Sequence, residues 1–358
     1  MKKHRIALIG LGMAIKPHAA SFLELHERLE VAAAYAPSAQ RREQFAARYP
    51  FPVVDSPEAI FDDPSIDSVI ILTPPWTHDQ LVRRAAAAGK HVLVEKPIDV
   101  DAERAAGLVE CCERAGVAFA VVFQHRFRPA SLRLAALLRQ GALGQVLSAS
   151  ASIRWWRSPE YYGGREGDPR SSGTHTSGTQ PGRGTIARDG GGVLLTQAIH
   201  TLDLLLHLVG PVQEVMAYVD TSPLRAIDTE DIVAGSVRYA NGATGVIDAT
   251  TVTYPGYPER VEIAGTAGSA VLEVETLTVH YMNGERFQLA GASAGGGGAD
   301  PMAFSHDHHR RVLMEFLDAI DGRREPMNSG RSALHVQRLI DALLASGRER
   351  RPVAVEGR

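Results

Sequence analysis

The first 125 residues alternate short apolar runs with amphipathic helical patterns, and this alternation restricts the fold more than any other feature of the chain. Strands joined by helices of this length form right-handed βαβ units with parallel strands. The sequence therefore predicts a doubly wound parallel sheet that ends near residue 125. Its expected strands cover residues 6–9, 31–35, 68–73, 91–95 and 117–123.

At 358 residues, the chain exceeds the usual size of a single core, so a second domain is expected over residues 126–358. Here strand patterns follow one another directly, and the Asn241-Gly242 and Asn283-Gly284 pairs favour tight hairpins. We predict an α+β domain with a large open, mainly antiparallel sheet, whose carboxyl-terminal helices have room to pack back on the first domain. The glycine-rich stretches at 163–185 and 291–299 are typical of long loops.

The composition of the chain indicates which kinds of binding partner are not expected. The formal charge is −3 without a basic block, so we expect no nucleic-acid partner. No apolar run approaches the ~20 residues that span a bilayer, and the chain enters a strand pattern directly, so we expect no membrane partner. The only cysteines, Cys111 and Cys112, are adjacent in a helical pattern, which suits a reducing compartment. These features predict a cytoplasmic protein.

A glycine turn follows the first strand and opens a helix. Its sequence is Gly10-Leu11-Gly12-Met13-Ala14-Ile15, with isoleucine at the third glycine position of the usual motif. In a βαβ unit, backbone amides of such a turn and the helix amino terminus face a pyrophosphate. The turn therefore indicates a dinucleotide site.

The end of the second strand bears on the choice of dinucleotide. NAD sites usually carry an acid there for the ribose 2′-hydroxyl, whereas this chain has Tyr35-Ala36-Pro37-Ser38 and then Arg41 and Arg42. Ser38 and an arginine suit a 2′-phosphate, so NADP is modestly favoured over NAD. The alternative is that both arginines are solvated helix residues. After the third strand, Thr73-Pro74-Pro75-Trp76-Thr77-His78 predicts an extended turn where a nicotinamide lies.

Several motifs, taken together in this order and spacing, resemble the Gfo/Idh/MocA family over nearly the whole chain. The resemblance implies a nicotinamide-dependent oxidoreductase with an amino-terminal Rossmann domain and a carboxyl-terminal domain whose open sheet mediates assembly into a homodimer or homotetramer. The motifs are the glycine turn with His18, Thr73-Pro74, Glu95-Lys96-Pro97, His125-Arg126, and Gly190-Gly191-Gly192 followed by Gln197, His200 and Asp203.

By this resemblance Lys96 matches the active-site lysine, His200 matches the catalytic histidine, and Pro97 follows a cis peptide bond. A lysine beside an oxidised, cationic nicotinamide is pushed toward neutrality, and a histidine suits the removal of a hydroxyl proton. Asp203 lies three residues after His200 on the same helix face, where it orients the ring or binds substrate. The cofactor-binding set is completed by Met13, Ala14, Trp76, His78, Glu95, Lys96, Pro97 and Arg126.

One position departs from the family pattern. Many relatives carry an aspartate four residues before the histidine, and this chain has Thr196. A threonine carries no charge, so the proton path is expected to use Lys96 and His200 with Asp203, Gln197 or water. The predicted substrate-binding residues are Lys96, Arg154, Trp155, Thr196, Gln197 and His200.

The resemblance suggests a polyol, cyclitol, sugar or sugar acid as substrate, oxidised at a secondary alcohol or formed in reverse. An aromatic cis-dihydrodiol is a competitor, because it presents the same vicinal hydroxyl pair. A glycosidase with tightly held NAD and a non-catalytic nicotinamide sensor are the alternatives from other classes.

No metal site is expected. His200, Asp203 and His207 share a helix face and residues 306–309 are rich in histidine, but no spacing matches a structural zinc site. The cluster at 306–309 is predicted to lie near a helix start and to line the substrate cleft or face solvent.

Overall fold

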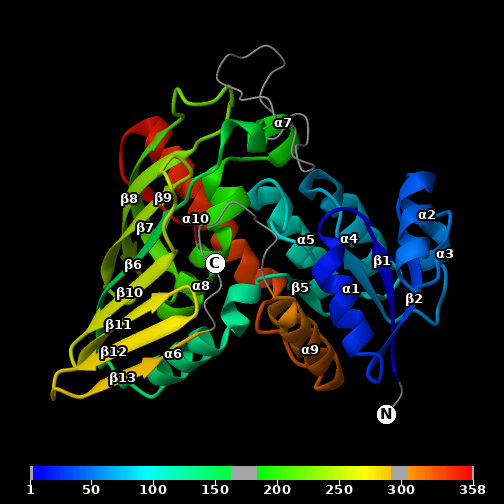
Figure 1. Ribbon diagram of the computed structural model, residues 1–358, viewed down its shortest axis with the longest axis horizontal. Helices are drawn as coiled ribbons and strands as arrows, with labels where there is room; N and C mark the ends of the chain where they lie inside the picture. The colour runs from blue at the N-terminus through cyan, green and yellow to red at the C-terminus, as the bar shows by residue number, and fades with distance from the viewer. Residues whose placement is uncertain (1–2, 163–183, 292–304, 357–358) are drawn as a thin grey trace. The chain divides into compact units, whose positions relative to one another are not determined.

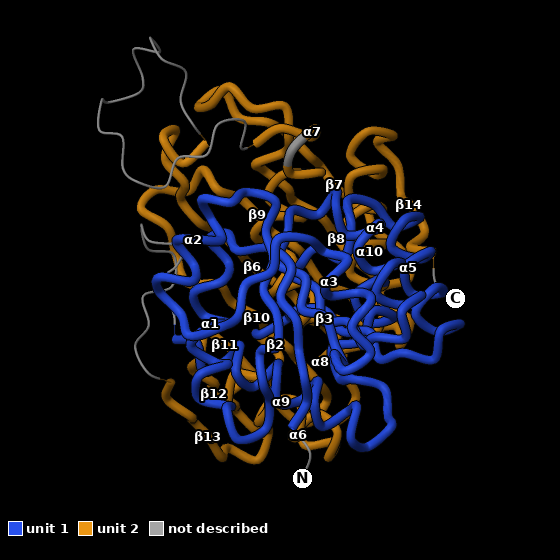
Figure 2. The backbone as a smooth tube through the Cα atoms, turned by 90° about the vertical axis from the view of Figure 1, so that its right-hand side faces the viewer, with its two compact units in different colours: residues 1–124, 305–334 blue, residues 125–304, 335–358 orange. Residues whose placement is uncertain are grey.

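A computed structural model describes residues 3–162, 184–291 and 305–356. The chain forms two compact units, one of residues 1–124 and 305–334 and the other of residues 125–304 and 335–358 (Figure 2). The predicted boundary at residue 125 coincides with the first passage between these units. Residues 305–334, which we predicted to be part of the second domain with helices able to pack back on the first, belong to the first unit. Most of the two glycine-rich stretches lies outside the described residues.

The first unit is built on a five-stranded sheet with the order β2-β1-β3-β4-β5, and its paired strands are parallel (Figure 1). Every residue of β3 and β5 is buried, as expected of a parallel sheet with both faces covered. This confirms the predicted doubly wound sheet. The strands are β1 (His4–Ile9), β2 (Leu29–Tyr35), β3 (Ser68–Ile71), β4 (His91–Val94) and β5 (Phe119–Val121).

The helices of this unit alternate with its strands, and α9 joins them from the far end of the sequence. They are α1 (Ile15–Glu24), α2 (Ala39–Arg48), α3 (Glu58–Phe61), α4 (His78–Ala87), α5 (Ala102–Ala115) and α9 (Asp307–Asp321), with a 3-10 turn η1 (Pro75–Thr77). Arg28 forms ion pairs with Asp318 at 2.6 Å and Asp321 at 3.0 Å, which ties α9 to the loop between α1 and β2.

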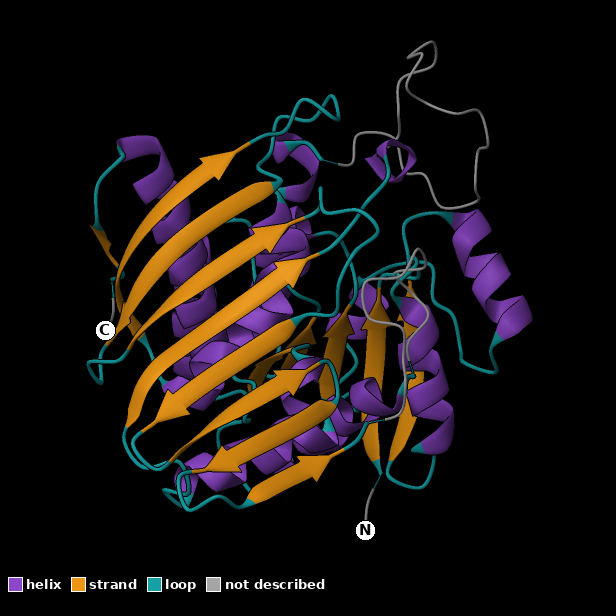
Figure 3. Cartoon of the chain, turned by 60° about the vertical axis from the view of Figure 1, so that its left-hand side comes forward, coloured by secondary structure: helices purple, strands orange, loops and turns teal. Residues whose placement is uncertain are grey.

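The second unit contains a nine-stranded sheet with the order β13-β12-β11-β10-β6-β9-β8-β7-β14 (Figure 3). Only the β6–β9 pair is parallel, so the predicted mainly antiparallel sheet is confirmed. The strands are β6 (Val146–Arg154), β7 (Val212–Asp220), β8 (Ile232–Tyr239), β9 (Thr244–Thr250), β10 (Arg260–Gly265), β11 (Gly268–Glu273), β12 (Thr276–Tyr281), β13 (Arg286–Leu289) and β14 (Val353–Ala354).

Residues of β8 alternate between exposed and buried, which shows that one sheet face forms the core. Helix α6 packs on β11 and β12, and α8 packs on β6. The helical segments are η2 (Gln124–Phe127), α6 (Pro129–Arg139), η3 (Pro159–Tyr162), α7 (Ile186–Asp189), η4 (Leu194–Ala198), α8 (Ile199–Val209) and α10 (Gly330–Glu349), of which η2 and α10 extend across the unit boundaries.

Several elements of the second unit differ from what the sequence pattern predicts. The pattern of residues 145–157 predicts a strand, but β6 ends at Arg154. The pattern of residues 192–209 predicts a continuous α-helix, which begins instead with the π-helical turn η4. Strands β13 and β14 were missed, because four and two residues are too few for a periodic pattern. Among the described residues, none of the helices combines the length and apolar character needed to cross a bilayer.

Candidate functional site

The two glycines of the first turn have different surroundings. Gly10 has φ +106°, and a Cβ there would lie 2.7 Å from the Leu72 carbonyl carbon, so only glycine fits. A Cβ on Gly12 would meet nothing within 4 Å. Met13 is 45% exposed, Ala14 is the N-cap residue of α1, and Ile15 is buried in the core. The turn thus keeps an accessible backbone at Gly12, as a dinucleotide site requires.

The polar side chains after β2 form hydrogen bonds within the turn that they belong to. Ser38 caps α2 by accepting a hydrogen bond from the Arg41 amide at 3.3 Å. The Arg42 guanidinium donates to the carbonyls of Ala36 at 2.7 Å and Pro37 at 3.1 Å, while Arg41 is exposed. These contacts give Ser38 and Arg42 a structural role, and the preference for NADP stays a prediction.

The turn after β3 is fixed by a buried histidine. The His78 ring lies with Nε2 2.9 Å from the Thr73 carbonyl and Nδ1 3.1 Å from the Pro97 carbonyl. Burial lowers the pKa of His78, and the nearby carbonyls of Thr73 and Ile98 oppose that shift. His78 therefore joins the Thr73-Pro74 turn to the Lys96-Pro97 turn, whereas Trp76 is 47% exposed. Their predicted contacts with the cofactor stay predictions.

Lys96 lies two residues after β4, at the carboxyl edge of the sheet where ligands of such sheets bind. The Lys96-Pro97 peptide bond is cis, which confirms that expectation. Lys96 is half-buried, and its backbone amide donates to Glu95 Oε2 at 3.1 Å. The Glu95 side chain thus holds the backbone that carries the lysine.

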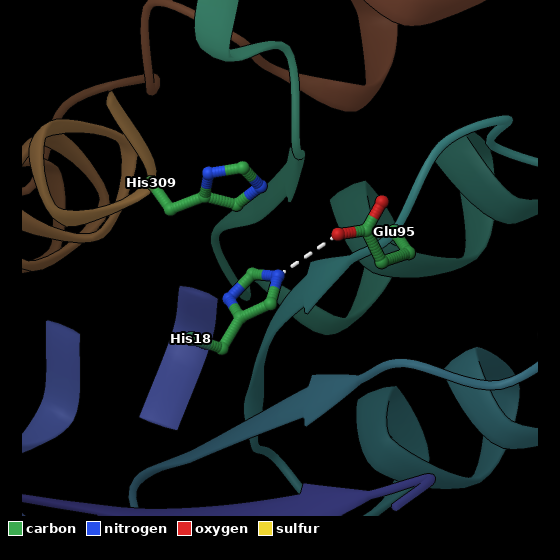
Figure 4. A group of neighbouring side chains, drawn as sticks. All are labelled: His18, Glu95 and His309. Carbon is green, nitrogen blue, oxygen red and sulfur yellow. Dashed lines mark hydrogen bonds and ion pairs between the residues drawn. The ribbon is translucent and has the colours of Figure 1, made fainter. Parts of the chain in front are cut away.

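Glu95 also belongs to a buried group with His18 and His309 (Figure 4). His18 Nε2 lies 2.8 Å from Glu95 Oε1, and the rings of His18 and His309 meet edge to face with centroids 5.0 Å apart. Burial would raise the pKa of Glu95, but the hydrogen bond and charge of His18 outweigh it and lower that pKa. Burial lowers the pKa of His309 to about 3.

The position of His309 excludes one of the two environments predicted for it, exposure to solvent, and its place at the substrate cleft stays a prediction. The cluster at 306–309 does mark a helix start, because α9 begins at Asp307. His309 itself is only 4% exposed and packs against His18 within the first unit, so it does not face solvent. The apolar periodicity of α9 places residue 309 on the buried side of the helix. The prediction overlooked this periodicity because four polar residues stand together at 306–309.

In the second unit, two predicted site residues pair with each other. The Arg126 guanidinium binds the Asp203 carboxylate through Nε and Oδ2 at 2.7 Å and through a second, parallel bond from Nη2 to Oδ1. Arg126 is 3% exposed and Asp203 is fully buried. This bidentate ion pair anchors α8 to η2. Arg126 and Asp203 therefore have a structural role in addition to the cofactor-binding role predicted for Arg126 and the catalytic role predicted for Asp203.

His200 is half-buried on the first turn of α8, and its ring lies 4.9 Å from that of His125, centroid to centroid. His125 Nε2 is 2.8 Å from an Arg128 nitrogen, and Arg128 binds Glu259 at 2.7 Å. The His125 ring beside His200 is thus linked through Arg128 to the buried carboxylate of Glu259. Sequence reasoning missed Glu259, which lies just outside β10 and far from any motif.

The turn before His200 depends on Gly192 and a second missed residue, Glu230. A Cβ on Gly192 would lie 1.9 Å from the Glu230 carbonyl oxygen. The Glu230 carboxylate accepts hydrogen bonds from the amides of Gly192 at 2.9 Å and Leu194 at 3.1 Å. The last glycine of the triplet is therefore required by close approach to Glu230, and the carboxylate fixes the start of η4.

The π-helical turn η4 contains Thr196 and Gln197. The Thr196 hydroxyl donates to the Gly192 carbonyl at 2.7 Å. Gln197 is 5% exposed, and its Oε1 has no hydrogen-bond partner within the described part of the chain. Single π-helical turns are frequent at functional sites, and a desolvated amide oxygen suits a ligand donor.

The remaining predicted substrate residues lie at the end of β6. Arg154 is exposed and 3.5 Å from Asp248, and Trp155 is half-buried with the Arg157 guanidinium 5.0 Å above its ring. The Arg157 side chain is buried and bonds the Trp156 carbonyl, so it is held by the protein itself. Of this group, Arg154 is the most accessible cation.

Comparison with known proteins agrees with this geometry. Residues 4–123 match the oxidoreductase family described as having an NAD-binding Rossmann fold, and residues 131–271 match the GFO/IDH/MocA C-terminal domain. The chain belongs to the Gfo/Idh/MocA family. It is therefore an oxidoreductase with a nicotinamide-dinucleotide-binding domain, as the sequence predicted.

Three relatives show the range of this similarity. Inositol 2-dehydrogenase of Rhizobium meliloti is 27% identical, over 98% of this chain and 99% of the relative. A 1-carboxy-3-chloro-3,4-dihydroxycyclohexa-1,5-diene dehydrogenase of Comamonas testosteroni is 31% identical, over 71% of this chain and 58% of the relative. The WlbA dehydrogenase of Bordetella pertussis, solved with NADH and UDP-GlcNAcA, has a TM-score of 0.80 at 25% identity, covering 100% of both chains.

Proposed function

We propose that this chain transfers hydride between NAD(P) and a secondary alcohol or ketone of a sugar, cyclitol or sugar acid. The observation that carries the proposal is Lys96, which lies two residues after β4 of the dinucleotide-binding sheet and precedes the cis proline Pro97. The inositol 2-dehydrogenase matches the chain over nearly its full length, which supports a polyhydroxylated substrate.

In this proposal Lys96 and His200 share the proton chemistry. The bound dinucleotide supplies the hydride acceptor when a secondary alcohol is oxidised to a ketone. Lys96 hydrogen-bonds the substrate oxygen, and His200 takes the hydroxyl proton on a ring nitrogen and releases it to water. Thr196 donates its hydroxyl to the Gly192 carbonyl and carries no charge, so it orients the turn and takes no part in proton transfer.

Asp203 is assigned a positioning role. Both of its carboxylate oxygens bond the Arg126 guanidinium, and removing one partner of a buried pair leaves an uncompensated charge. The pair therefore fixes α8, and with it His200, against η2. Gln197, whose buried Oε1 lacks a partner within the described residues, is the candidate acceptor for a substrate hydroxyl.

A second candidate substrate is an aromatic cis-dihydrodiol that carries a carboxylate. The Comamonas testosteroni relative, named for such a compound, favours it. Arg154, exposed on β6, offers a guanidinium for the carboxylate. Hydride would leave the same kind of carbinol carbon, so the reaction class is unchanged.

The proposal also covers assembly and compartment. A homodimer or homotetramer is supported by the open nine-stranded sheet, which leaves the exposed residues of β8 on one face. A cytoplasmic location is supported by the two free thiols, Cys111 and Cys112. Either NAD or NADP fits the turn after β2.

The first test is titration with NAD(H) and NADP(H), followed at the nicotinamide absorbance while sugars, cyclitols, sugar acids and dihydrodiols are added. Substrate-dependent reduction is expected. Lys96→Ala and His200→Asn should each lower kcat by about 10²–10⁴-fold, because the first removes the hydrogen bond to the substrate oxygen and the second removes the group that takes the hydroxyl proton. Their cofactor affinity should change by no more than a few fold.

Lys3→Ala is the matched control, since Lys3 is an exposed lysine of the same unit, and it should retain wild-type turnover. Normal turnover of Lys96→Ala would remove Lys96 from the mechanism. Cofactor binding without redox change across the whole panel would favour the glycosidase or sensor alternatives, and failure to bind either dinucleotide would refute the proposal.

A further inference from the structure

We propose that His18, Glu95 and His309 form a binding site for a divalent cation of the Zn²⁺ type. The three side chains come from α1, from the residue after β4 and from α9, and they project toward one another (Figure 4). All belong to the first unit, so the site is complete within it.

The geometry is close to that of a coordination site. One ligand atom from each residue lies within 4.8 Å of the other two, and the closest pair, His18 Nε2 and Glu95 Oε1, is 2.8 Å apart. Around tetrahedral zinc, with bonds of about 2.0–2.2 Å, neighbouring ligand atoms are roughly 3.4 Å apart. The hydrogen-bonded pair must therefore open by about half an ångström to take zinc-like spacing.

The ligand types select the class of cation. Two imidazoles and one carboxylate are a ligand set used by zinc, with the fourth position open to water or another ligand. Ca²⁺ and Mg²⁺ prefer oxygen ligands throughout, so they fit this group poorly. His18 and His309 are 1% and 4% exposed, whereas the Glu95 side chain keeps 15% exposure, which offers the ion a route inward.

Occupancy of this site would reach Lys96. Glu95 Oε2 accepts a hydrogen bond from the Lys96 amide at 3.1 Å, while Oε1 bonds His18 at 2.8 Å. A cation on Glu95 replaces the second bond and draws the carboxylate away from its present position. On the proposed function, which this step requires, Zn²⁺ therefore inhibits hydride transfer without competing with substrate.

A second group of potential metal ligands lies in the same unit, and a test must distinguish binding there from binding at His18, Glu95 and His309. Glu24, His306 and Asp307 also bring three ligand atoms within 4.8 Å of one another, but their residues are exposed or half-buried. His306 Nε2 lies 2.7 Å from Glu24 Oε1 on the surface of the same unit. A His306→Gln variant removes a ligand from this surface group and leaves the buried one intact, so it is the matched control.

The test uses tag-free, metal-stripped full-length protein. Zn²⁺ is titrated against a chromophoric chelator, and Co²⁺ is titrated while its visible absorption is followed. The wild type and His306→Gln should bind one Zn²⁺ with micromolar affinity or better and give the strong visible bands of tetrahedral Co²⁺. His309→Gln should bind at least tenfold more weakly and lose those bands. The near-isosteric Glu95→Gln serves the same purpose if His309→Gln does not fold.

Equal affinity in the wild type and His309→Gln, or Co²⁺ bands that only His306→Gln abolishes, would overturn the site. Inhibition is measured separately, as the effect of Zn²⁺ on turnover at saturating substrate. Tight binding without dehydrogenase activity would leave the cation site standing and refute the proposed function. Normal activity without binding would do the reverse, and binding without inhibition would refute the link to Lys96.

Discussion

Gly10 and Gly12 look equivalent in the sequence, but their surroundings assign them different tasks. At Gly10 the positive φ of +106° and the contact of 2.7 Å with Leu72 exclude any side chain. We expect Gly10→Ala to destabilise the protein by about 2 kcal/mol or more, the cost of a strained backbone plus a steric clash. Gly12→Ala, with nothing within 4 Å, should fold like the wild type and bind the dinucleotide at least tenfold more weakly.

Thermal unfolding and cofactor titration of the two variants provide the measurement. Gly89 serves as a control for Gly10, because its φ of +67° is also positive but a Cβ there would meet nothing within 4 Å. Gly89→Ala should therefore carry the backbone cost without the clash. If Gly12→Ala binds cofactor as tightly as the wild type, the turn does not approach the pyrophosphate.

Residue-level prediction from the sequence succeeded where a motif fixes its own local geometry. Glu95-Lys96-Pro97 is such a case, since the end of a strand is a local feature, whereas the cis bond before Pro97 was expected from the family resemblance. Prediction was weaker for residues whose bonding partner is distant in the sequence. Arg126 and Asp203 are 77 positions apart, and nothing in either motif indicates that they bind each other. Ser38 caps α2, and because a helix cap and a phosphate ligand use the same hydroxyl, its predicted contact with a 2′-phosphate stays a prediction.

At the scale of a single element, the position of His207 in α8 exposes its ring to two effects that shift its pKa in opposite directions. His207 lies in the last turn, where the helix dipole favours a cation by about 0.3–1 kcal/mol. Burial, with smaller contributions from Arg126 and Arg139, outweighs the dipole and lowers the pKa of His207 from 6.5 to about 4. The native state therefore holds this ring neutral at pH values where the unfolded chain binds a proton.

The free energy of unfolding should consequently fall as the pH drops from about 6.5 to about 4, by at most about 1.4 kcal/mol per pH unit from this group. His207→Gln should flatten that dependence, measured by urea unfolding at several pH values. His26→Gln is the control, because the His26 side chain is 67% exposed. Parallel curves for His207→Gln and wild type would show that His207 does not titrate in this way.

The elements themselves were predictable where periodicity is strong. The long helices repeat their apolar pattern over enough residues to be recognised, and the parallel strands were recognised as short apolar runs placed between those helices. The π-helical turn η4 was not predictable, because the residues around Thr196 and Gln197 have the same apolar pattern in an α-helix as in a π-helix. What sets it apart is the pairing of Gly192 and Leu194 with Glu230, 38 and 36 positions away.

At the scale of the whole molecule, the decisive feature is the return of residues 305–334 to the first unit. This return adds α9 to the dinucleotide-binding unit and supplies His309. Asn328 joins it to the edge of the parallel sheet, because its backbone carbonyl accepts from the Val121 amide at 2.9 Å and its side-chain amide donates to the Val121 carbonyl at 2.5 Å. A separation of 207 residues hides this pairing from any local pattern.

Asn328→Ala tests that connection in the intact chain. Asn328 is fully buried, so the loss of its side-chain hydrogen bond should lower the free energy of unfolding by about 1–3 kcal/mol. Amide hydrogen exchange should accelerate together in β5 and α9, whereas the nine-stranded sheet should exchange as in the wild type. Asn283→Ala, at an exposed hairpin turn of the second unit, should show the opposite distribution. Equal acceleration in both units would mean that the chain unfolds as one cooperative body and that Asn328 stabilises the whole of it.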